Sequence, residues 1–324
     1  MKLPVGLKLL VPGYRSGWRK RCACLTQELH ALAPRLTYGQ EGQTPWIAVD
    51  GARLHGFITE PENRELHQIL RPYLPASIPL SHFRLVKDAL TRFVYPHMRP
   101  DLKPAGHAPD DMFGFHGQHK DAIADIGDAG ARALLMDAFR PKDGESFLDC
   151  GAFLGFGEVH LSRAITGGRF HAIEASGTCH GLLERNLAAN GVANARAIHR
   201  AVWNTETELE LEASFAQANS LVSEVHKGRR TERVRTITLD GAVREFGFER
   251  LDMLSLTLNG AEVEAIDGGK DMLRRFRPRI RLAGWYSRGG RKIWEITKAQ
   301  LEELNYRVFV GARGNVMALP KERA

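Results

Sequence analysis

The stretch FLDCGAFLGFGEVHLSRA, residues 147–164, decides the fold because it combines a buried strand, a glycine-rich turn and a helix. Its glycines allow the chain to turn sharply and allow a ligand to approach the backbone closely. Their spacing matches neither the G-x-G-x-x-G dinucleotide fingerprint nor a phosphate loop, which requires Lys followed by Ser or Thr. Taken alone, the turn also fits an ordinary helix N-terminus, where Asp and Gly occur for local reasons.

From residue 146 onward, apolar strands alternate with helices of about a dozen residues, which is typical of βαβ units. We therefore predict an α/β fold with a doubly wound, Rossmann-like parallel sheet. The last two strands are only a few residues apart and should pair antiparallel at one edge. A ligand should bind beyond the carboxyl ends of the strands, near the first one. The expected strands are residues 146–150, 169–175, 195–202, 234–239, 250–258, 278–286, 306–310 and 315–320.

Two acidic residues stand at the ends of the first two strands. Asp149 opens the glycine turn and suits a cationic or hydroxyl-bearing ligand better than a pyrophosphate. Glu174 ends the second strand, 19 residues beyond Gly155. An acid at this place can accept both hydroxyl hydrogens of a ribose, although a Glu there can also cap the next helix. Together, the turn and the acid predict a ligand that contains a nucleoside.

Six segments follow one another along the chain: residues 147–164 (the glycine turn), 172–191 (second-strand acid and following helix), 194–211, 218–224, 234–243 and 250–280. In this order they resemble the motifs of the FkbM-type S-adenosylmethionine-dependent methyltransferases. The resemblance covers about residues 130–320 and implies a seven-stranded methyltransferase domain over 131–324. Residues 1–130 would then be an N-terminal α+β extension or cap.

The resemblance implies S-adenosylmethionine as the cofactor and assigns residues to its parts. Asp149, Gly151, Ala152 and Gly155 would shape the amino-acid end, Glu174 would bind the ribose hydroxyls, and Ala201 to Asn204 would border the adenine. The chemistry agrees, because the cationic methionine half suits a carboxylate and the sugar needs a bidentate acceptor.

The sequence departs from the family after the fourth strand. The family usually reads Lys-x-Asp-x-Glu-Gly-Ala-Glu, whereas residues 255–262 read SLTLNGAE. Thr257 and Asn259 keep hydrogen-bonding capacity but supply neither a general base nor a hard metal site, so no metal is expected. Thr257, Asn259 and Glu262 are the candidate catalytic residues. The base would be Glu262 or a histidine, unless orientation suffices because the methyl donor is already activated.

The N-terminal part mixes short elements. Residues 46–57 predict a hairpin around Asp50-Gly51, a pair suited to a turn with positive φ. Residues 62–74 and 81–94 predict short amphipathic helices. The loop at 107–119 carries His and Asp residues, but their spacing matches no established metal motif.

Composition excludes several classes of protein. The 324 residues include 45 Lys and Arg against 38 Asp and Glu, a net charge of +7 spread over both halves of the chain. This excess is too dilute to predict a nucleic-acid groove. No uncharged apolar run is long enough to span a bilayer. The four cysteines show no disulfide or zinc spacing, which favours a reducing compartment and hence the cytoplasm. The basic first 21 residues would be a solvated tail or would contact acidic lipid or nucleic acid.

The sequence as a whole predicts an S-adenosylmethionine-dependent methyltransferase that methylates an oxygen of a sugar or small biosynthetic product. Its partner would be a small-molecule or glycan acceptor. One alternative is a degenerate methyltransferase-like protein that binds the cofactor without turnover, because carboxylates are missing at the expected reaction site. The other is an RNA-directed methyltransferase or RNA-binding module, suggested by the basic N-terminus.

Overall fold

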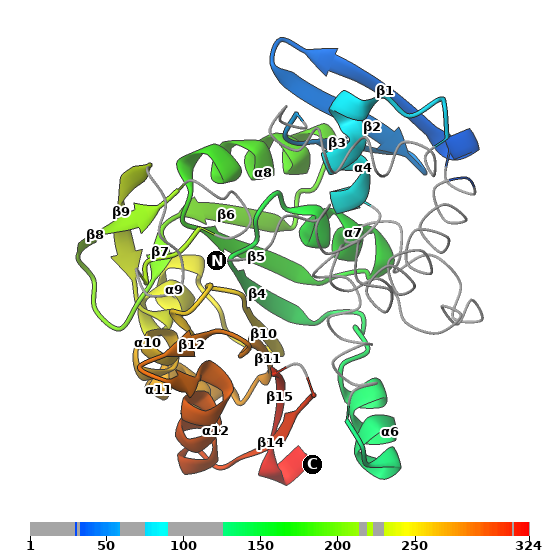
Figure 1. Ribbon diagram of the computed structural model, residues 1–324. Helices are drawn as coiled ribbons and strands as arrows, with labels where there is room; N and C mark the ends of the chain where they lie inside the picture. Colours follow the sequence, from blue (N-terminus) through cyan, green and yellow to red (C-terminus); the bar gives the residue numbers. More distant parts are fainter. Residues whose placement is uncertain are drawn as a thin grey trace, which may run out of the picture. The chain divides into compact units, whose positions relative to one another are not determined.

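The computed structural model describes residues 30, 33–58, 75–89, 126–213, 219–222, 230–312 and 314–323 (Figure 1). The chain divides into two compact units, residues 1–117 and 118–324. The domain boundary predicted at residue 130 stays a prediction. The basic N-terminal segment, the helix predicted at 62–74 and the His- and Asp-containing loop at 107–119 lie outside the described residues.

The first unit contains an antiparallel sheet of three strands in the order β1-β2-β3. The predicted hairpin is confirmed: β2 and β3 pair across Asp50 and Gly51, both at positive φ. A strand not expected from the sequence, β1, pairs along the other edge of β2. The elements are a 3-10 helix (Ala33–Arg35), β1 (Leu36–Glu41), β2 (Thr44–Val49), β3 (Ala52–His55), a second 3-10 helix (Leu80–His82) and α4 (Phe83–Ala89).

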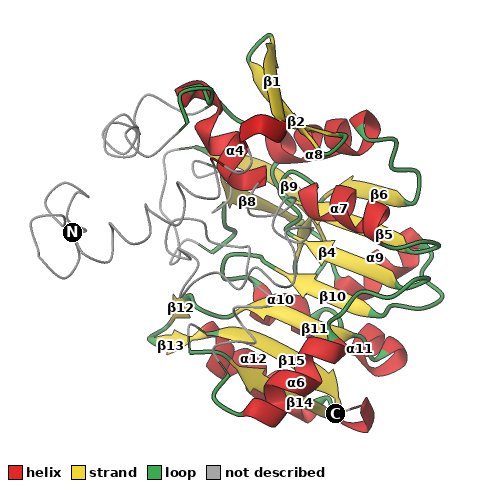
Figure 2. Ribbon diagram, turned by 90° about the vertical axis from the view of Figure 1, so that its right-hand side faces the viewer, coloured by secondary structure: helices red, strands yellow, loops and turns green. Residues whose placement is uncertain are grey.

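The second unit contains a seven-stranded sheet in the order β14-β15-β11-β10-β4-β5-β6 (Figure 2). The strands β11, β10, β4, β5 and β6 pair in parallel, and β15 runs antiparallel to both β11 and β14. The predicted doubly wound sheet with its reversed C-terminal hairpin is thus confirmed. The strands are β4 (Ser146–Cys150), β5 (Arg169–Glu174), β6 (Ala195–His199), β10 (Met253–Leu256), β11 (Arg279–Ala283), β14 (Tyr306–Val310) and β15 (Asn315–Pro320).

Helices connect these strands, and three of them begin at a side-chain cap. Asp128, Ser176 and Thr238 each accept a hydrogen bond from the backbone N–H three residues on, which satisfies a donor that the first turn leaves unpaired. The helices are α6 (Ala129–Ala138), α7 (Phe156–Ala164), α8 (Gly177–Ala189), α9 (Leu239–Phe246), α10 (Glu262–Asp267), α11 (Lys270–Phe276) and α12 (Ile293–Glu303), with a final 3-10 helix (Lys321–Arg323).

The two faces of the sheet have separate cores. Alternate residues of each strand point to opposite faces. Leu254 of β10 and Ile280 of β11 join a core that includes residues of α9, α11 and α12. Met253 of β10 and Phe147 of β4 join a second core with residues of α6. Figure 1 shows α9, α11 and α12 on one side of the sheet and α6 and α7 on the other.

The predicted third strand, residues 195–202, is divided in the structure. The N–H of Arg200 donates to the carbonyl of Glu174, and the chain then leaves the main sheet. The strand that follows, residues 201–202, pairs with one strand of a separate hairpin. This small sheet consists of β7 (Ala201–Val202), β9 (Thr231–Ile237) and β8 (Glu208–Glu212), and a further short hairpin of β12 (Ser287–Arg288) and β13 (Arg291–Lys292) follows β11.

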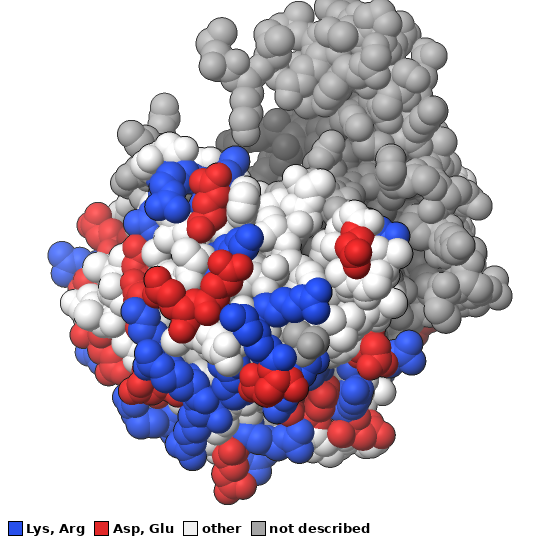
Figure 3. All heavy atoms as spheres, turned by 90° about the horizontal axis from the view of Figure 1, so that it is seen from below, with Lys and Arg blue, Asp and Glu red and all other residues white. Residues whose placement is uncertain are grey.

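The charged residues include a buried ion pair and a surface of mixed charge. At the amino-terminal edge of the sheet, the buried Arg279 guanidinium binds the Glu145 carboxylate with two hydrogen bonds of 2.8 and 2.6 Å. On the face drawn in Figure 3, basic and acidic side chains are intermixed. None of the helices within the described ranges is long and apolar enough to cross a membrane.

Candidate functional site

The turn after β4 has the backbone conformation that its glycines permit. Gly151 (φ +83°) and Gly155 (φ +72°) both lie in the left-handed region, and Phe153 between them has φ +57°. The N–H groups of Gly151 and Ala152 donate to the carbonyl of Ile173 on β5, at 2.8 and 3.3 Å. The turn is therefore attached to the neighbouring strand and curves back toward its end.

Glu174, at the end of β5, lies directly beside this turn. Its Oε2 accepts a hydrogen bond from the Phe153 N–H at 2.8 Å, and its Oε1 accepts one from the Ser176 N–H at 2.9 Å. The side chain is 7% exposed. These two bonds hold the carboxylate in one orientation between the glycine turn and the start of α8. A carboxylate at this place can accept the hydroxyl hydrogens of a ribose.

Asp149 is half-buried on β4, in register with Ser255 on β10. A Cβ on Gly157 would lie 4.0 Å from the Asp149 Oδ2, so the carboxylate faces the first turn of α7. Burial, and secondarily the charge of Asp149, raise the pKa of the neighbouring Cys150 thiol well above its usual value. The thiol is therefore protonated near neutral pH, and Asp149 is the group that can attract a cation here.

The residues predicted to border adenine follow β6. Ala201 is buried and packs in a small cluster with Ala175, which directly follows Glu174. Asn204 is exposed. A Cβ on Gly268 would lie 2.9 Å from the Asn204 Cα, so this segment runs tightly past the end of α10. Ala201 is thus near the predicted ribose acid, whereas the Asn204 backbone packs against a different element.

The turn after β10 touches the glycine turn. The Thr257 N–H donates to the Cys150 carbonyl at 2.9 Å. A Cβ on Gly151 would lie 2.9 Å from the carbonyl carbon of Thr257 and would collide with its oxygen. Residue 151 must therefore be glycine for two reasons, its positive φ and this contact. The structure thus brings the predicted cofactor turn and the predicted reaction turn together.

Asn259 links three segments at this edge. Its Nδ2 donates to the Asn219 carbonyl (2.8 Å), its backbone carbonyl accepts from the Ser220 Oγ (2.7 Å), and its Oδ1 contacts the Tyr286 Oη (3.0 Å). Because a backbone carbonyl can only accept, the amide nitrogen must face Asn219 and the amide oxygen must face Tyr286. The Tyr286 hydroxyl therefore donates this hydrogen bond, and the Asn259 Oδ1 accepts it.

Glu262 begins α10 and is fully buried. Its two carboxylate oxygens accept hydrogen bonds from the N–H groups of Leu258 and Gly260, at 2.8 and 2.9 Å. Burial raises its pKa to about 7, against the opposing effect of these backbone N–H groups. The Glu262 side chain thus binds the backbone of the turn that leads into its own helix, and these bonds hold the turn after β10 in shape. Such a pKa suits a proton acceptor at neutral pH, but the side chain has no exposed surface.

Two further residues lie near these turns, and sequence reasoning missed the first of them. Arg281 lies within β11, where its Nη1 donates to the Ser255 Oγ at 3.0 Å and approaches the Thr257 Oγ1 at 3.4 Å. An arginine inside the apolar segment RIRLA was the signal that could have identified it. Tyr286 follows the same strand. Burial raises its pKa, against the opposing effect of a hydrogen bond with the Trp285 side chain.

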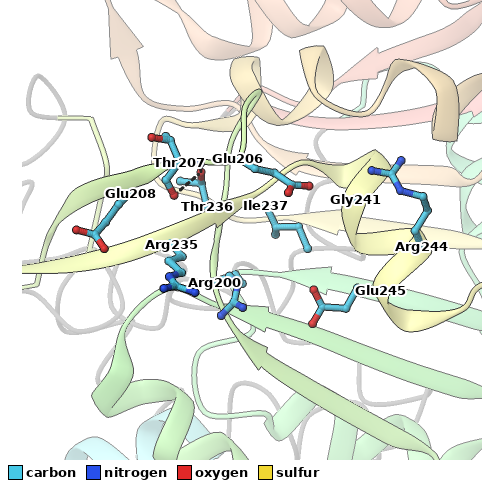
Figure 4. A pocket seen from close by; sticks show the side chains of 10 residues that line it. All are labelled: Arg200, Glu206, Thr207, Glu208, Arg235, Thr236, Ile237, Gly241, Arg244 and Glu245. Atoms are coloured by element: carbon cyan, nitrogen blue, oxygen red, sulfur yellow. Dashed lines mark hydrogen bonds between the residues drawn. The ribbon is translucent and has the colours of Figure 1, made fainter.

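A separate cavity of about 560 Å³ is lined by residues of β9, of α9 and of the segment that leads into β8, and it contains none of the predicted site residues (Figure 4). Three arginines and three glutamates line it, so it has no dominant charge. Two of the glutamates form ion pairs with arginines outside the lining, Glu208 with Arg233 and Glu245 with Arg196. We therefore place the candidate site at the turns after β4, β5 and β10.

The residues present fit S-adenosylmethionine. Gly151 and Gly155 give the turn its positive-φ conformation, the Glu174 carboxylate is held in one orientation by two N–H groups, and Asp149 is a half-buried carboxylate. A sugar diol and a cationic group are the ligands that two such carboxylates would suit. Among the described residues, no three His, Cys, Asp or Glu side chains are grouped so that they could hold a metal ion.

Comparison with known proteins gives a family. Residues 149–312 match the model of a family described as the methyltransferase FkbM domain, and these 164 residues are just over half of the 324-residue chain. No curated protein matches the chain.

Several solved structures are similar to the chain. An FkbM methyltransferase from Methylobacillus flagellatus KT shares 13% identity, covering 81% of this chain and 71% of that one, with a TM-score of 0.42. A precorrin-6y C5,15-methyltransferase from Geobacter metallireducens GS-15 shares 16% identity over 60% and 88% of the two chains (TM-score 0.35). A SAM-dependent methyltransferase from Aquifex aeolicus shares 15% over 61% and 95% (TM-score 0.34).

Proposed function

Since the chain belongs to the FkbM methyltransferase domain family, we propose that it binds S-adenosylmethionine at the carboxyl edge of its seven-stranded sheet and methylates an oxygen of a sugar or small biosynthetic product. The observation that carries the proposal is the attachment of the Glu174 carboxylate to the glycine turn through the Phe153 N–H. The bond holds a carboxylate that could accept the hydroxyl hydrogens of a diol directly beside the glycine turn. A cytoplasmic location is part of the same proposal.

The chain's own residues would bind and orient the two reactants. When bound, S-adenosylmethionine supplies a methyl group that is already activated by a positively charged sulfur. Glu174 would hold the ribose and Asp149 the cationic end. Glu262 would shape the turn after β10 through its two backbone hydrogen bonds. With Thr257 and Asn259 in place of carboxylates, transfer would depend mainly on orientation of the acceptor hydroxyl.

The class of acceptor is inferred from the charge distribution and from the polar residues of the turn after β10. The chain's net charge of +7 is spread over both halves of the sequence, and the one face drawn in Figure 3 carries mixed charges, whereas phosphate backbones favour concentrated positive charge. A hydroxyl group, as on Thr257, hydrogen-bonds neutral hydroxylated molecules. Both observations support a small hydroxylated acceptor over nucleic acid.

The proposal is tested first by isothermal titration with S-adenosylhomocysteine. We expect binding that Glu174→Gln weakens at least about tenfold, because a neutral amide replaces a charged bidentate acceptor. Glu184→Gln is a matched control, since Glu184 is exposed on α8 and its side chain is 61% accessible. No binding by the wild-type protein, or an equal effect of both substitutions, would contradict the cofactor assignment.

The transfer step is tested by incubating the protein with S-adenosylmethionine and a panel of sugars and small hydroxylated molecules. Formation of S-adenosylhomocysteine together with a methylated acceptor supports the enzyme. Tight cofactor binding without product across the panel supports the second candidate, a cofactor-binding protein without turnover. The internal hydrogen bonds of Asn259 and Glu262 favour that candidate, because they occupy groups that would otherwise face an acceptor.

A further inference from the structure

Three polar residues form a row across the middle of the seven-stranded sheet. Ser255 on β10 is in register with Asp149 on β4 and with Arg281 on β11. Residues in register on adjacent strands project from the same face of a sheet. The row therefore places a carboxylate and a guanidinium on one face, separated by a serine.

The Arg281 side chain extends over β10 toward β4. It is 4% exposed, and its Nη1 donates to the Ser255 Oγ at 3.0 Å and approaches the Thr257 Oγ1 at 3.4 Å. A buried guanidinium loses its hydration, so hydrogen bonds to such hydroxyls are stronger than the same bonds in water. Arg281 thus attaches the last residues of β10 to β11.

Thr257 transmits this attachment to the glycine turn. Its backbone N–H is bonded to the Cys150 carbonyl, and its own carbonyl occupies the space that a side chain on Gly151 would fill. The side-chain hydroxyl of Thr257 is thus near Arg281, while its backbone contacts the turn expected to hold the amino-acid end of the cofactor. If the Thr257 backbone rotated, its carbonyl would press against Gly151 and displace the glycine turn.

We propose that Arg281 is a positioning residue for the amino-acid tail of the bound nucleoside. By holding Thr257 against Gly151, it sets the spacing between the turns after β4 and β10. The nucleoside end, at Glu174 on the far side of the glycine turn, does not depend on it. This inference rests on the proposed function and names the part of the ligand that Arg281 controls.

The test compares two ligands that differ in that tail. S-adenosylhomocysteine carries the amino-acid tail, and 5′-methylthioadenosine has the same nucleoside without it. Titration calorimetry on the full chain should show that Thr257→Val, which removes the hydroxyl and keeps the shape, weakens S-adenosylhomocysteine at least about threefold. Arg281→Met should weaken it at least about tenfold, as expected for losing hydrogen bonds to a charged group. Affinity for 5′-methylthioadenosine should change by less than about twofold.

Two further variants separate positioning from stability. Arg281→Lys keeps the charge and should restore part of the lost affinity. Arg279 lies two residues before Arg281 on β11, at the amino-terminal edge of the sheet and thus away from the candidate site. Arg279→Lys should leave the ratio of the two affinities unchanged even if it lowers stability. If Arg281→Met does not fold by circular dichroism, Thr257→Val and Arg281→Lys decide the question.

The outcomes distinguish the two levels of the proposal. A wild-type protein that binds neither nucleoside overturns the proposed function and this inference with it. If the wild type binds S-adenosylhomocysteine but folded variants keep its affinity, or lose affinity for both ligands equally, the role of Arg281 is overturned and the proposed function stands.

Discussion

Replacing Glu262 by Gln should change how the stability of the protein depends on pH. Glu262 is fully buried, and burial raises the pKa of its carboxyl group from 4.5 to about 7. In the unfolded chain the same group ionises near 4.5. Between these two values the folded state holds a proton that the unfolded state has lost. The contribution of Glu262 to stability is therefore fully present below pH 4.5 and is lost as the pH rises to about 7.

The magnitude follows from the two pKa values. At about 1.4 kcal/mol per pH unit, a rise from 4.5 to about 7 corresponds to about 3 kcal/mol in the free energy of unfolding. Roughly 2.5 kcal/mol of this is lost between pH 5 and pH 8. A glutamine at this position stays neutral throughout. Its amide nitrogen cannot accept a hydrogen bond, so one of the two N–H groups that Glu262 binds loses its acceptor. That loss lowers stability by the same amount at every pH and leaves the pH dependence as the quantity to compare.

The assay is urea unfolding at pH 5, 6, 7 and 8, followed by tryptophan fluorescence. Relative to wild type, Glu262→Gln should gain about 2 to 3 kcal/mol between pH 5 and pH 8. Glu303→Gln, at an exposed site at the end of α12, should run parallel to wild type. Parallel curves for wild type and Glu262→Gln would refute the reasoning, because they would mean that Glu262 ionises in the folded protein as it does in water.

Two predictions concern stability alone. Gly151→Ala should lower the free energy of unfolding by more than about 2 kcal/mol, because a Cβ would combine positive φ with a collision against the neighbouring turn; Gly157→Ala, inside α7, should be neutral or stabilising by up to about 1 kcal/mol. Equal urea midpoints for the two variants would contradict this. Arg279→Met should cost about 3 to 5 kcal/mol because it leaves the buried Glu145 carboxylate without its cation, and a thermal midpoint within a degree or two of wild type would refute it.

Most of the sheet could be predicted from the sequence, because each strand and helix has its own periodicity. The hairpin of β14 and β15 followed from the short connection between them. The division of residues 195–202 into β6 and β7 did not follow, because both halves have the same apolar pattern. The break depends on the Arg200 N–H, which bonds to the Glu174 carbonyl on the neighbouring strand. A local pattern carries no information about that partner.

The sequence by itself determined the glycine turn after β4 and the acid that ends β5, because turn residues and strand ends are local properties of the chain. Only the tertiary structure decided what surrounds them. The burial of Glu262 and the contact of Arg281 with Ser255 depend on strands that lie far apart in sequence. Their register is set by how the whole sheet packs, and packing depends on all the strands together. The sequence therefore indicated where a ligand would bind, and the packed sheet decided which side chains hold that place in shape.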